Sequence, residues 1–323
     1  MGRSFSEESC AADFGLGRPK AEFTLAGRGQ MNPLGVLRLE TDRGTFAIKQ
    51  SLYPPRPVAL RIERMAHEAG LTMPTPILTV EGRSSARYAV DTKRVWVRAF
   101  GWVDGEAGAW GSVSERASFE VAGVIGRVQQ LPLMAFMLED KPHRPLHERH
   151  WRKLARSARE RHKPWARLLD ERIDLLVEAE AHADREAHYP QCVSHRDYHP
   201  PNFIEPKSGP RALVDWDSAG TASPRLEALR FALIWATPEV GPPQRDLVRA
   251  FVRGYEASGL QLPAPTLDEM IAQAQPRVRW IRFNVLRGLR NEVEVEPGLV
   301  EALLQTVAPL DHDELESLRG FFA

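Results

Sequence analysis

Two short segments of the chain carry residue types that can do acid–base and metal chemistry. The first contains His195, Asp197 and Asn202 in the pattern H-x-D-x-x-x-x-N. The second is a short apolar stretch that ends in two acids, Asp215 and Asp217. A carboxylate can accept a proton from a hydroxyl, and carboxylate and amide oxygens can hold a divalent cation. Because the two segments occur in this order and close together, they are a stronger signal than either one alone.

These residue types suit the transfer of a γ-phosphoryl group to a hydroxyl, and the first pattern is that of a kinase catalytic loop. The reaction needs a base within reach of the acceptor's proton, and Asp197 can be that base. It also needs Mg²⁺, which prefers hard oxygen ligands such as those of Asn202 and Asp215. We expect His195 to be a structural residue that holds the loop, and His199 to be structural as well.

A lysine in the first third of the chain supplies the charge that a nucleotide needs. Lys49 ends an apolar strand, where one ammonium group can bind the α- and β-phosphates. The alternative to this phosphate-binding role is that Lys49 is simply a solvent-exposed lysine on a strand. Lys49 needs a carboxylate to orient it, and we expect Glu63, which flanks the apolar face of the following helix. Glu68 is the alternative partner, and solvent exposure is the alternative for both acids.

A glycine-bearing turn over residues 27–32 precedes the next strand. Glycine lets backbone N–H groups approach an anion closely, so Gly29 and Asn32 are expected over the phosphates. The turn does not match G-x-G-x-x-G, and a simple hairpin would give the same pattern.

The elements that must position these residues change in type along the chain. Residues 1–20 are mixed, with one short helix. The alternation of apolar and polar residues predicts strands over 21–25, 36–41, 45–49, 86–90 and 94–100, and helical spacing predicts a helix over 58–69. Beyond Gly105 the spacing predicts helices over 114–131, 146–160, 164–188, 224–236, 244–258, 267–291, 297–308 and 312–321, with a strand-and-turn patch at 191–217 between them.

Length and composition narrow the class of protein. The 323 residues are 43% hydrophobic and 27% charged, which is too apolar for wholesale disorder and long enough for two cores. The net charge of zero gives no reason to expect nucleic acid or an anionic membrane as a partner. Two cysteines cannot form a disulfide framework. The sequence shows no secretory signal and no apolar run of about 18 residues, so a cytoplasmic protein is expected.

The motifs resemble those of the aminoglycoside phosphotransferase/choline kinase family. The similar stretches are a Gly-Leu-x-x-Pro turn at 70–74, H-x-D-x-H-P-x-N at 195–202, D-W-D at 215–217 and a small-Pro-x-x-acid stretch at 223–227. The resemblance covers residues 21–105 and 190–236 well, whereas 106–189 and 237–323 match only in type.

The resemblance implies an α+β, protein-kinase-like two-lobed fold. Residues 1–100 would form a nucleotide-binding lobe with a small antiparallel sheet and one helix, and residues 101–323 a larger, mainly helical lobe with the catalytic loop and acceptor site. The adenine would lie at the hinge near 98–103, where Arg98 and Phe100 are expected to contact it.

The same resemblance implies ATP or GTP as donor, Mg²⁺, and a hydroxylated small molecule as acceptor. Asp197 matches the family's base, Asn202 and Asp215 its metal ligands, and Lys49 its phosphate-binding lysine.

The chain also departs from this pattern. Arg196 stands where glycine is usual in the family, and Glu227 where many relatives carry aspartate. There is no D-F-G, no A-P-E and no room for an activation loop after Asp217, so proteins are not expected as acceptors.

The acceptor site is expected on the helical segments. In the helix over 267–291, Arg279 and Arg282 share a side with Arg290, and Trp280 lies beside them. We expect Arg279, Trp280 and Arg282, together with Asp217, to bind an anion-tolerant or stacking acceptor. Pairing of the arginines with Glu292, Glu294 and Glu296 is an equally good explanation.

Two further features of the helical part have open interpretations. The basic stretch 141–172 would repel a cationic aminoglycoside if it lined the cleft, but a solvated helix face explains it more simply. Trp102 and Trp110 could stack on a flat acceptor, although burial in the core is the favoured interpretation.

The sequence therefore predicts a cytoplasmic kinase that phosphorylates a hydroxyl of a small molecule, above all an antibiotic that it inactivates. The alternative is a metabolic kinase for an amino alcohol, a homoserine-like acid or a sugar. A non-catalytic nucleotide-binding module is disfavoured, because Lys49, Asp197, Asn202 and Asp215 are all present. A monomer or homodimer that binds neither nucleic acid nor membrane is expected.

Overall fold

The computed structural model describes residues 3–29, 32–90, 93–135, 137, 146–181, 189–273, 275–290, 298–307 and 311–323. The chain divides into two compact units, each of which is described by itself. Unit 1 comprises Met1–Trp110 and His195–Gly220, and unit 2 comprises Gly111–Ser194 and Thr221–Ala323.

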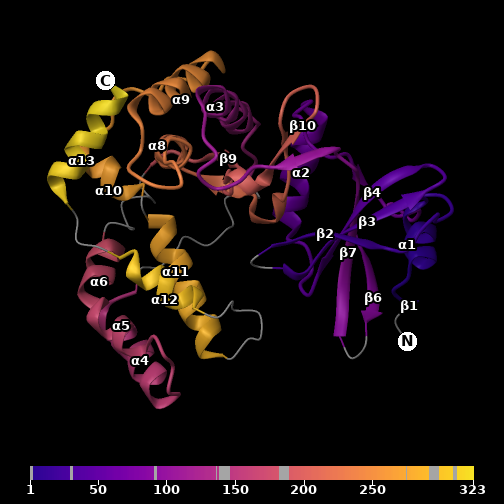
Figure 1. Ribbon diagram of the computed structural model, residues 1–323, viewed down its shortest axis with the longest axis horizontal. Coiled ribbons are helices and arrows are strands. Elements are labelled where there is room, and N and C mark those ends of the chain that lie inside the picture. Colours follow the sequence, from indigo (N-terminus) through magenta and orange to yellow (C-terminus); the bar gives the residue numbers. More distant parts are fainter. Residues whose placement is uncertain are drawn as a thin grey trace. The chain divides into compact units, whose positions relative to one another are not determined.

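Unit 1 is built on a seven-stranded sheet in the described part of the chain (Figure 1). Its strand order is β1-β6-β7-β4-β3-β2, and β5 also pairs with β7. All described pairings are antiparallel except that of β1 with β6. The strands are β1 (Arg3–Ser4), β2 (Thr24–Gly29), β3 (Asn32–Thr41), β4 (Gly44–Ser51), β5 (Pro76–Ile77), β6 (Ala86–Val90) and β7 (Lys93–Gly101).

Two helices accompany this sheet. Helix α1 (Glu7–Phe14) begins with a capping box at Ser6 and buries Phe14 against a core that includes Leu39 and Ile48 of the sheet. Helix α2 (Pro57–Glu68) has proline at its first position, where a missing N–H costs nothing, and it buries Ile62 completely. Each helix therefore turns an apolar face inward.

The strand-and-turn patch expected at 191–217 belongs to unit 1 from His195 onward. Strand β8 (Gly105–Ala107) pairs with β10 (Phe203–Pro206), which pairs with β11 (Ala212–Leu213). Two 3₁₀ turns, η2 (Pro200–Asn202) and η3 (Trp216–Ser218), contain the end of the expected catalytic loop and most of the D-W-D stretch. This pairing with β8 joins residues 195–220 to the unit that carries the large sheet.

Unit 2 is helical. Its helices are α3 (Glu115–Gln129), α4 (Glu148–Glu160), α5 (Ala166–Glu171), α6 (Ile173–Ala181), α8 (Pro224–Ile234), α9 (Arg245–Ala257), α10 (Leu267–Ala272), α11 (Gln275–Leu289), α12 (Leu299–Gln305) and α13 (His312–Arg319), with a final turn η4 (Gly320–Phe322). Strand β9 (Cys192–Ser194) pairs with β12 (Gly220–Ala222).

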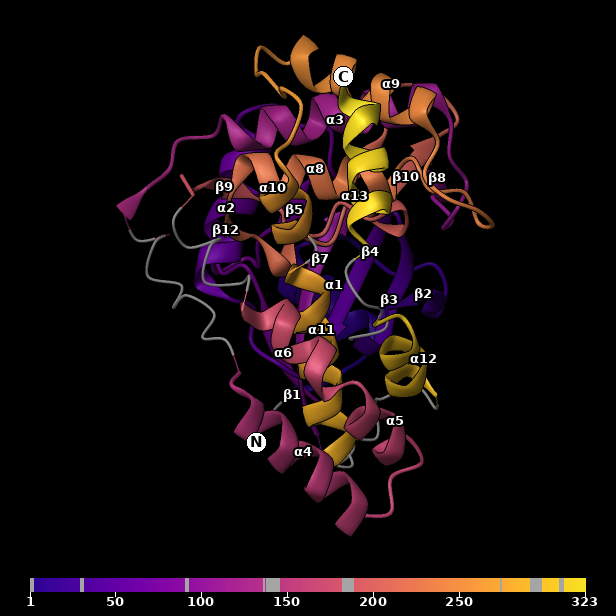
Figure 2. The same cartoon turned by 90° about the vertical axis from the view of Figure 1, so that its left-hand side faces the viewer.

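Helices α4, α5, α6, α11 and α12 lie together, as Figures 1 and 2 both show. Trp151, Trp165, Ile281, Val285 and Leu304 are among the buried residues of their shared core. Val278, Ile281, Val285 and Leu289, all from the helix expected over 267–291, are part of this core. None of the helices in the described part of the chain is long and apolar enough to cross a lipid bilayer.

Several expected elements have different bounds. The helix expected over 164–188 is two helices, α5 and α6, within the described residues, and that over 267–291 is α10 and α11. Proline at 276 has no N–H to donate within a continuous helix, which favours a new helix start there. The turn expected over 27–32 is mostly strand, because β2 continues to Gly29 and β3 begins at Asn32.

The compact units also differ in their bounds from the two expected lobes. Unit 1 extends to Trp110 and includes residues 195–220, which were expected in the helical lobe. The reason is the β8–β10 pairing. The functional division at residue 100 stays a prediction.

Candidate active site

The loop that begins at His195 is held by its own buried groups. His195 is fully buried, its backbone N–H donates to the Tyr198 hydroxyl at 3.1 Å, and its Nε2 lies 2.9 Å from the Val214 carbonyl oxygen. Burial lowers the pKa of His195 below its usual value, which favours the neutral ring. A neutral ring that donates to a backbone carbonyl fits the structural role expected for this histidine.

Asp197 is held at the surface of this loop by two neighbours. Asn202 Nδ2 donates to the Asp197 carbonyl oxygen at 2.9 Å, and His199 Nδ1 is hydrogen-bonded to Asp197 Oδ1. Burial raises the pKa of Asp197, but the hydrogen bond and charge of His199, aided by His195 and Asn202, hold that pKa below its usual value. An ionised carboxylate with one engaged oxygen is suited to accept a proton on the other.

The Trp110 ring lies 4.9 Å from the ring of His199, and Trp110 is 58% exposed. The favoured expectation of a core residue was therefore wrong for Trp110, which presents an aromatic surface next to the Asp197–His199 pair. Trp102 is half-buried, with the Arg38 guanidinium 5.4 Å from its ring.

Asp215 follows β11 in a left-handed backbone conformation, with φ 64°. Aspartate tolerates this conformation better than most residues, because its short polar side chain can bond locally. The Val214 N–H donates to the Asn202 carbonyl oxygen at 2.9 Å, which fastens the two expected metal-ligand segments to each other. The sequence spacing therefore brings Asn202 and Asp215 together.

The residue between His195 and Asp197 also has a positive φ. Arg196 has φ 66°, and a Cβ built on Gly220 would lie 2.3 Å from the Arg196 guanidinium carbon. Glycine suits position 196 because it adopts the left-handed conformation without strain. Arg196 stands at this position instead, and Gly220 has no side chain that would collide with the arginine.

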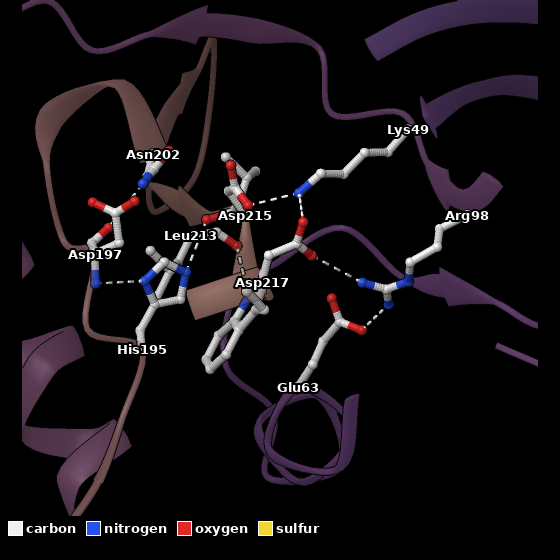
Figure 3. Close-up of polar contacts among 11 residues, drawn as sticks. Lys49, Glu63, Arg98, His195, Asp197, Asn202, Leu213, Asp215 and Asp217 are labelled. Carbon is white, nitrogen blue, oxygen red and sulfur yellow. Dashed lines mark hydrogen bonds and ion pairs between the residues drawn. The ribbon is translucent and has the colours of Figure 1, made fainter. Parts of the chain in front are cut away.

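Lys49 on β4 points at the acids of the D-W-D stretch (Figure 3). Its Nζ lies 2.6 Å from Asp215 Oδ1 and 2.8 Å from Asp217 Oδ2. Burial lowers the pKa of Lys49, but the two acids more than offset this and leave the pKa above its usual value. Burial likewise raises the pKa of Asp215, and Lys49 holds it below its usual value. The Lys49 side chain is charged and only 11% exposed, so the alternative of a solvated strand lysine was wrong.

Glu63 points toward the sheet, as expected, but its partner differs from the expected one. Glu63 is buried, and its Oε2 pairs with Arg98 Nη2 rather than with Lys49. The expected Lys49–Glu63 contact was wrong for the described structure, because Lys49 reaches across to Asp215 and Asp217. The alternative partner Glu68 lies 3.8 Å from Arg64 on the exposed face of α2.

Arg98 and Phe100 were expected at a hinge beside adenine. Both lie inside β7, which continues to Gly101. The Arg98 guanidinium stacks 4.7 Å above the Phe100 ring and is buried in its pairs with Glu63 and Asp217. A role for either residue in adenine binding stays a prediction.

The residues expected to bind the acceptor lie in different units. Asp217 is in unit 1 and faces Lys49 and Arg98, whereas Arg279, Trp280 and Arg282 are half-buried on α11 of unit 2, and Trp280 stacks on Phe283 at 5.7 Å. A shared acceptor pocket stays a prediction. The glutamates at 292, 294 and 296, named as alternative partners, lie outside the described residues, as does part of the basic stretch 141–172.

Gly29 and Asn32 pair with each other at the end of the β2–β3 hairpin. Their expected role over the phosphates is not tested by this placement.

Sequence reasoning missed two contacts, Glu63–Arg98 and His199–Asp197. The sequence holds no signal for the first, because the β4–β7 register that makes Lys49 and Arg98 direct partners on one face of the sheet is a feature of the structure. The His199–Asp197 contact had a weak sequence signal, because the two residues are only two positions apart in the loop.

Residues 26–261 match the model of the phosphotransferase enzyme family. No curated protein sequence matches the chain significantly.

Solved structures match along most of the chain. A spectinomycin phosphotransferase in complex with ADP and spectinomycin has a TM-score of 0.65 at 12% identity, over 97% of each chain. An amicoumacin kinase in complex with AMP-PNP, Ca²⁺ and Ami has a TM-score of 0.63 at 13% identity, over 95% of each chain. A choline kinase from Streptococcus pneumoniae has a TM-score of 0.57 at 12% identity, over 97% of each chain.

These likenesses show the fold, which is α+β and protein-kinase-like, as expected. The family match covers well over half of the chain and confirms that the protein is an enzyme that transfers phosphoryl groups. The chain therefore belongs to the phosphotransferase enzyme family.

Proposed function

We propose that the protein is an ATP- or GTP-dependent and Mg²⁺-dependent O-phosphotransferase that acts on a hydroxyl of a small molecule, above all an antibiotic. The observation that carries this is the gathering of Asp197, Asn202, Asp215 and Lys49 within unit 1. Each group has the charge or the donor atom that the reaction needs.

Asp197 is the proposed general base. In the reaction, the acceptor oxygen forms a bond to the γ-phosphorus while the bond from that phosphorus to the β–γ bridging oxygen breaks. The hydroxyl proton passes to the Asp197 carboxylate, and the products are a phosphate monoester and a nucleoside diphosphate. The pKa of Asp197, held low mainly by His199 against the effect of burial, keeps this carboxylate ionised at neutral pH.

Asn202 and Asp215 have the donor atoms that Mg²⁺ prefers. The Asn202 amide nitrogen is engaged by the Asp197 carbonyl, which directs its oxygen elsewhere, and Asp215 offers a carboxylate. Among the described residues, no three His, Cys, Asp or Glu side chains gather as a metal cage. A pair of oxygen ligands completed by phosphates and water is usual for Mg²⁺. When bound, Mg²⁺ would neutralise charge on the phosphates.

Lys49 is the proposed phosphate-binding residue, because it is charged and lies beside Asp215. Nucleotides in similar structures support a nucleotide donor, since their complexes contain ADP and AMP-PNP. The proposed location is the cytoplasm, where both nucleotides are available.

Two solved structures of similar fold, a spectinomycin phosphotransferase and an amicoumacin kinase, support an antibiotic as acceptor. Adding a phosphate dianion to a hydroxyl that a drug uses for binding its target would abolish that binding through charge and desolvation. A metabolic kinase for an amino alcohol is the second candidate, because choline and ethanolamine kinases share the fold.

The test is mass spectrometry of products formed from a broad acceptor panel with Mg-ATP and with Mg-GTP. The panel spans aminoglycosides, macrolides, nucleoside and peptide antibiotics, choline, ethanolamine, homoserine and sugars. We expect one phosphorylated class with the wild type, loss of product with Asp197→Asn, and full product with the matched control Asp246→Asn on the exposed face of α9. Absence of nucleotide binding by the wild type would overturn the proposal.

A further inference from the structure

Five charged side chains in unit 1 form a continuous chain of ion pairs (Figure 3). From α2 to the D-W-D stretch the order is Glu63, Arg98, Asp217, Lys49 and Asp215. Arg98 Nη1 lies 3.6 Å from Asp217 Oδ1, and Lys49 Nζ lies 2.8 Å from Asp217 Oδ2. The Asp217 carboxylate is thus shared between two cations, one on each of its oxygens.

The strand register explains why Asp217 is shared. Lys49 on β4 and Arg98 on β7 are direct cross-strand partners. Two like charges in this position repel, because their Cβ atoms are only about 5 Å apart. An acid between the two cations removes this repulsion, and Asp217 occupies that position. The strand register therefore places two cations next to each other, and Asp217 of the D-W-D stretch offsets their repulsion.

The Glu63–Arg98 end of the chain is buried. The side chains of Glu63 and Arg98 are 4% and 9% exposed, whereas those of Asp215 and Asp217 are each 44% exposed. Removing one partner of a buried pair leaves an uncompensated charge in the interior, which is strongly destabilising. Glu63 thus fastens α2 to the sheet through Arg98, and this fastening does not involve Lys49.

We infer that Arg98 and Asp217 are positioning residues that together replace a direct pair between Lys49 and the α2 glutamate. Arg98 holds Glu63, and Asp217 orients Lys49. The consequence for catalysis rests on the proposed function. The D-W-D stretch directs the ammonium group of Lys49 toward the phosphates. The position of α2 does not determine the orientation of Lys49.

The first test is a set of double-mutant cycles on urea unfolding of the full chain without nucleotide. The variants are Glu63→Gln, Arg98→Met and Lys49→Met, alone and in pairs. Contacting residues show non-additive effects. We expect Glu63 and Arg98 to be coupled by about tenfold or more in the unfolding equilibrium constant, and Glu63 and Lys49 by less than about threefold. Coupling of Glu63 to Lys49 that equals or exceeds its coupling to Arg98 would overturn the inference.

The second test observes Lys49 directly. The chain has only seven lysines, so NMR of protein labelled with ¹³C at lysine Cε gives a simple spectrum, in which Lys49→Arg assigns the Lys49 signal. We expect Asp217→Asn to shift the Lys49 signal. Asp217→Glu, which keeps the carboxylate, should give a signal much closer to the wild-type position. Glu63→Gln should leave the signal near its wild-type position. A shift with Glu63→Gln and none with Asp217→Asn would contradict the inference.

The same spectrum separates the inference from the proposed function. A Lys49 signal that responds to Asp217→Asn but not to saturating Mg-ATP or Mg-GTP would leave the positioning role intact and count against the phosphate-binding role. A signal that responds to nucleotide but not to Asp217→Asn would support the proposed function and refute the positioning role.

Discussion

The packing of α3 on α9 predicts that one substitution, glycine to alanine, has opposite effects at two positions of the same interface. A Cβ built on Gly254 of α9 would lie 2.1 Å from the Phe119 carbonyl oxygen and 2.7 Å from the Phe119 Cα. These are backbone atoms, so no side-chain rotation relieves the clash. A Cβ built on Gly123 of α3 would meet only the Gly254 carbonyl oxygen, at 3.5 Å, which is an ordinary contact.

The magnitudes follow from two opposing effects. Alanine in place of glycine within a helix stabilises it by about 1 kcal/mol. Overpacking a tight contact costs about 1–3 kcal/mol, and more where backbone must move. Gly123→Ala should therefore stabilise the protein by about 0.5–1 kcal/mol. Gly254→Ala should destabilise it by about 1–2 kcal/mol once the helix gain is subtracted.

The assay is urea unfolding of the two variants and the wild type, followed by far-UV circular dichroism. We expect the unfolding midpoints in the order Gly123→Ala, wild type, Gly254→Ala. Equal midpoints for the two variants, or a higher midpoint for Gly254→Ala, would refute the close approach of α9 to Phe119.

Three further predictions concern single side chains. Burial raises the pKa of Glu269, but Arg225 and Thr266 together outweigh burial and hold that pKa below its usual value. Glu269→Gln should therefore destabilise the protein at neutral pH, and progressively less as pH falls below the ordinary carboxyl pKa. Urea midpoints measured against pH check this, and a pH-independent difference contradicts it. His199→Leu should move the acid limb of the kcat/KM pH profile to higher pH. Burial raises the pKa of Asp197, and this variant loses the His199 hydrogen bond that opposes the effect of burial. An acid limb that does not move would count against the His199–Asp197 pair. Trp110→Ala should raise the KM for the acceptor and leave the KM for the nucleotide unchanged. A raised nucleotide KM with an unchanged acceptor KM would contradict a role of Trp110 in acceptor binding.

The sequence predicts those parts of the site that depend on local spacing. Asp197 and Asn202 lie in one short loop, and the apolar strand before Asp215 pairs beside that loop, so proximity follows from a few residues of chain. The strand that carries Lys49 is equally local, because its alternating pattern and the turn before it define it.

The partners of charged groups are not local and could not be predicted in the same way. Glu63 was expected to reach Lys49 because Glu63 points toward the sheet that carries Lys49, but Arg98 lies in register with Lys49 and faces the same side. The choice between two cations depends on a few ångströms of placement between α2, β4 and β7. Trp110 was misjudged for a similar reason, because exposure of an aromatic residue after a strand depends on what packs over it.

The most direct test of the central claim is the rate of phosphoryl transfer by the wild type and by Asp197→Asn at saturating, calorimetrically verified occupancy by Mg-nucleotide. If Asp197 is the base of a small-molecule phosphotransferase, the variant binds nucleotide as tightly as the wild type but forms phosphorylated acceptor about 10²–10⁴-fold more slowly. An Asp197→Asn variant that binds nucleotide and transfers the phosphoryl group at the wild-type rate would contradict the claim.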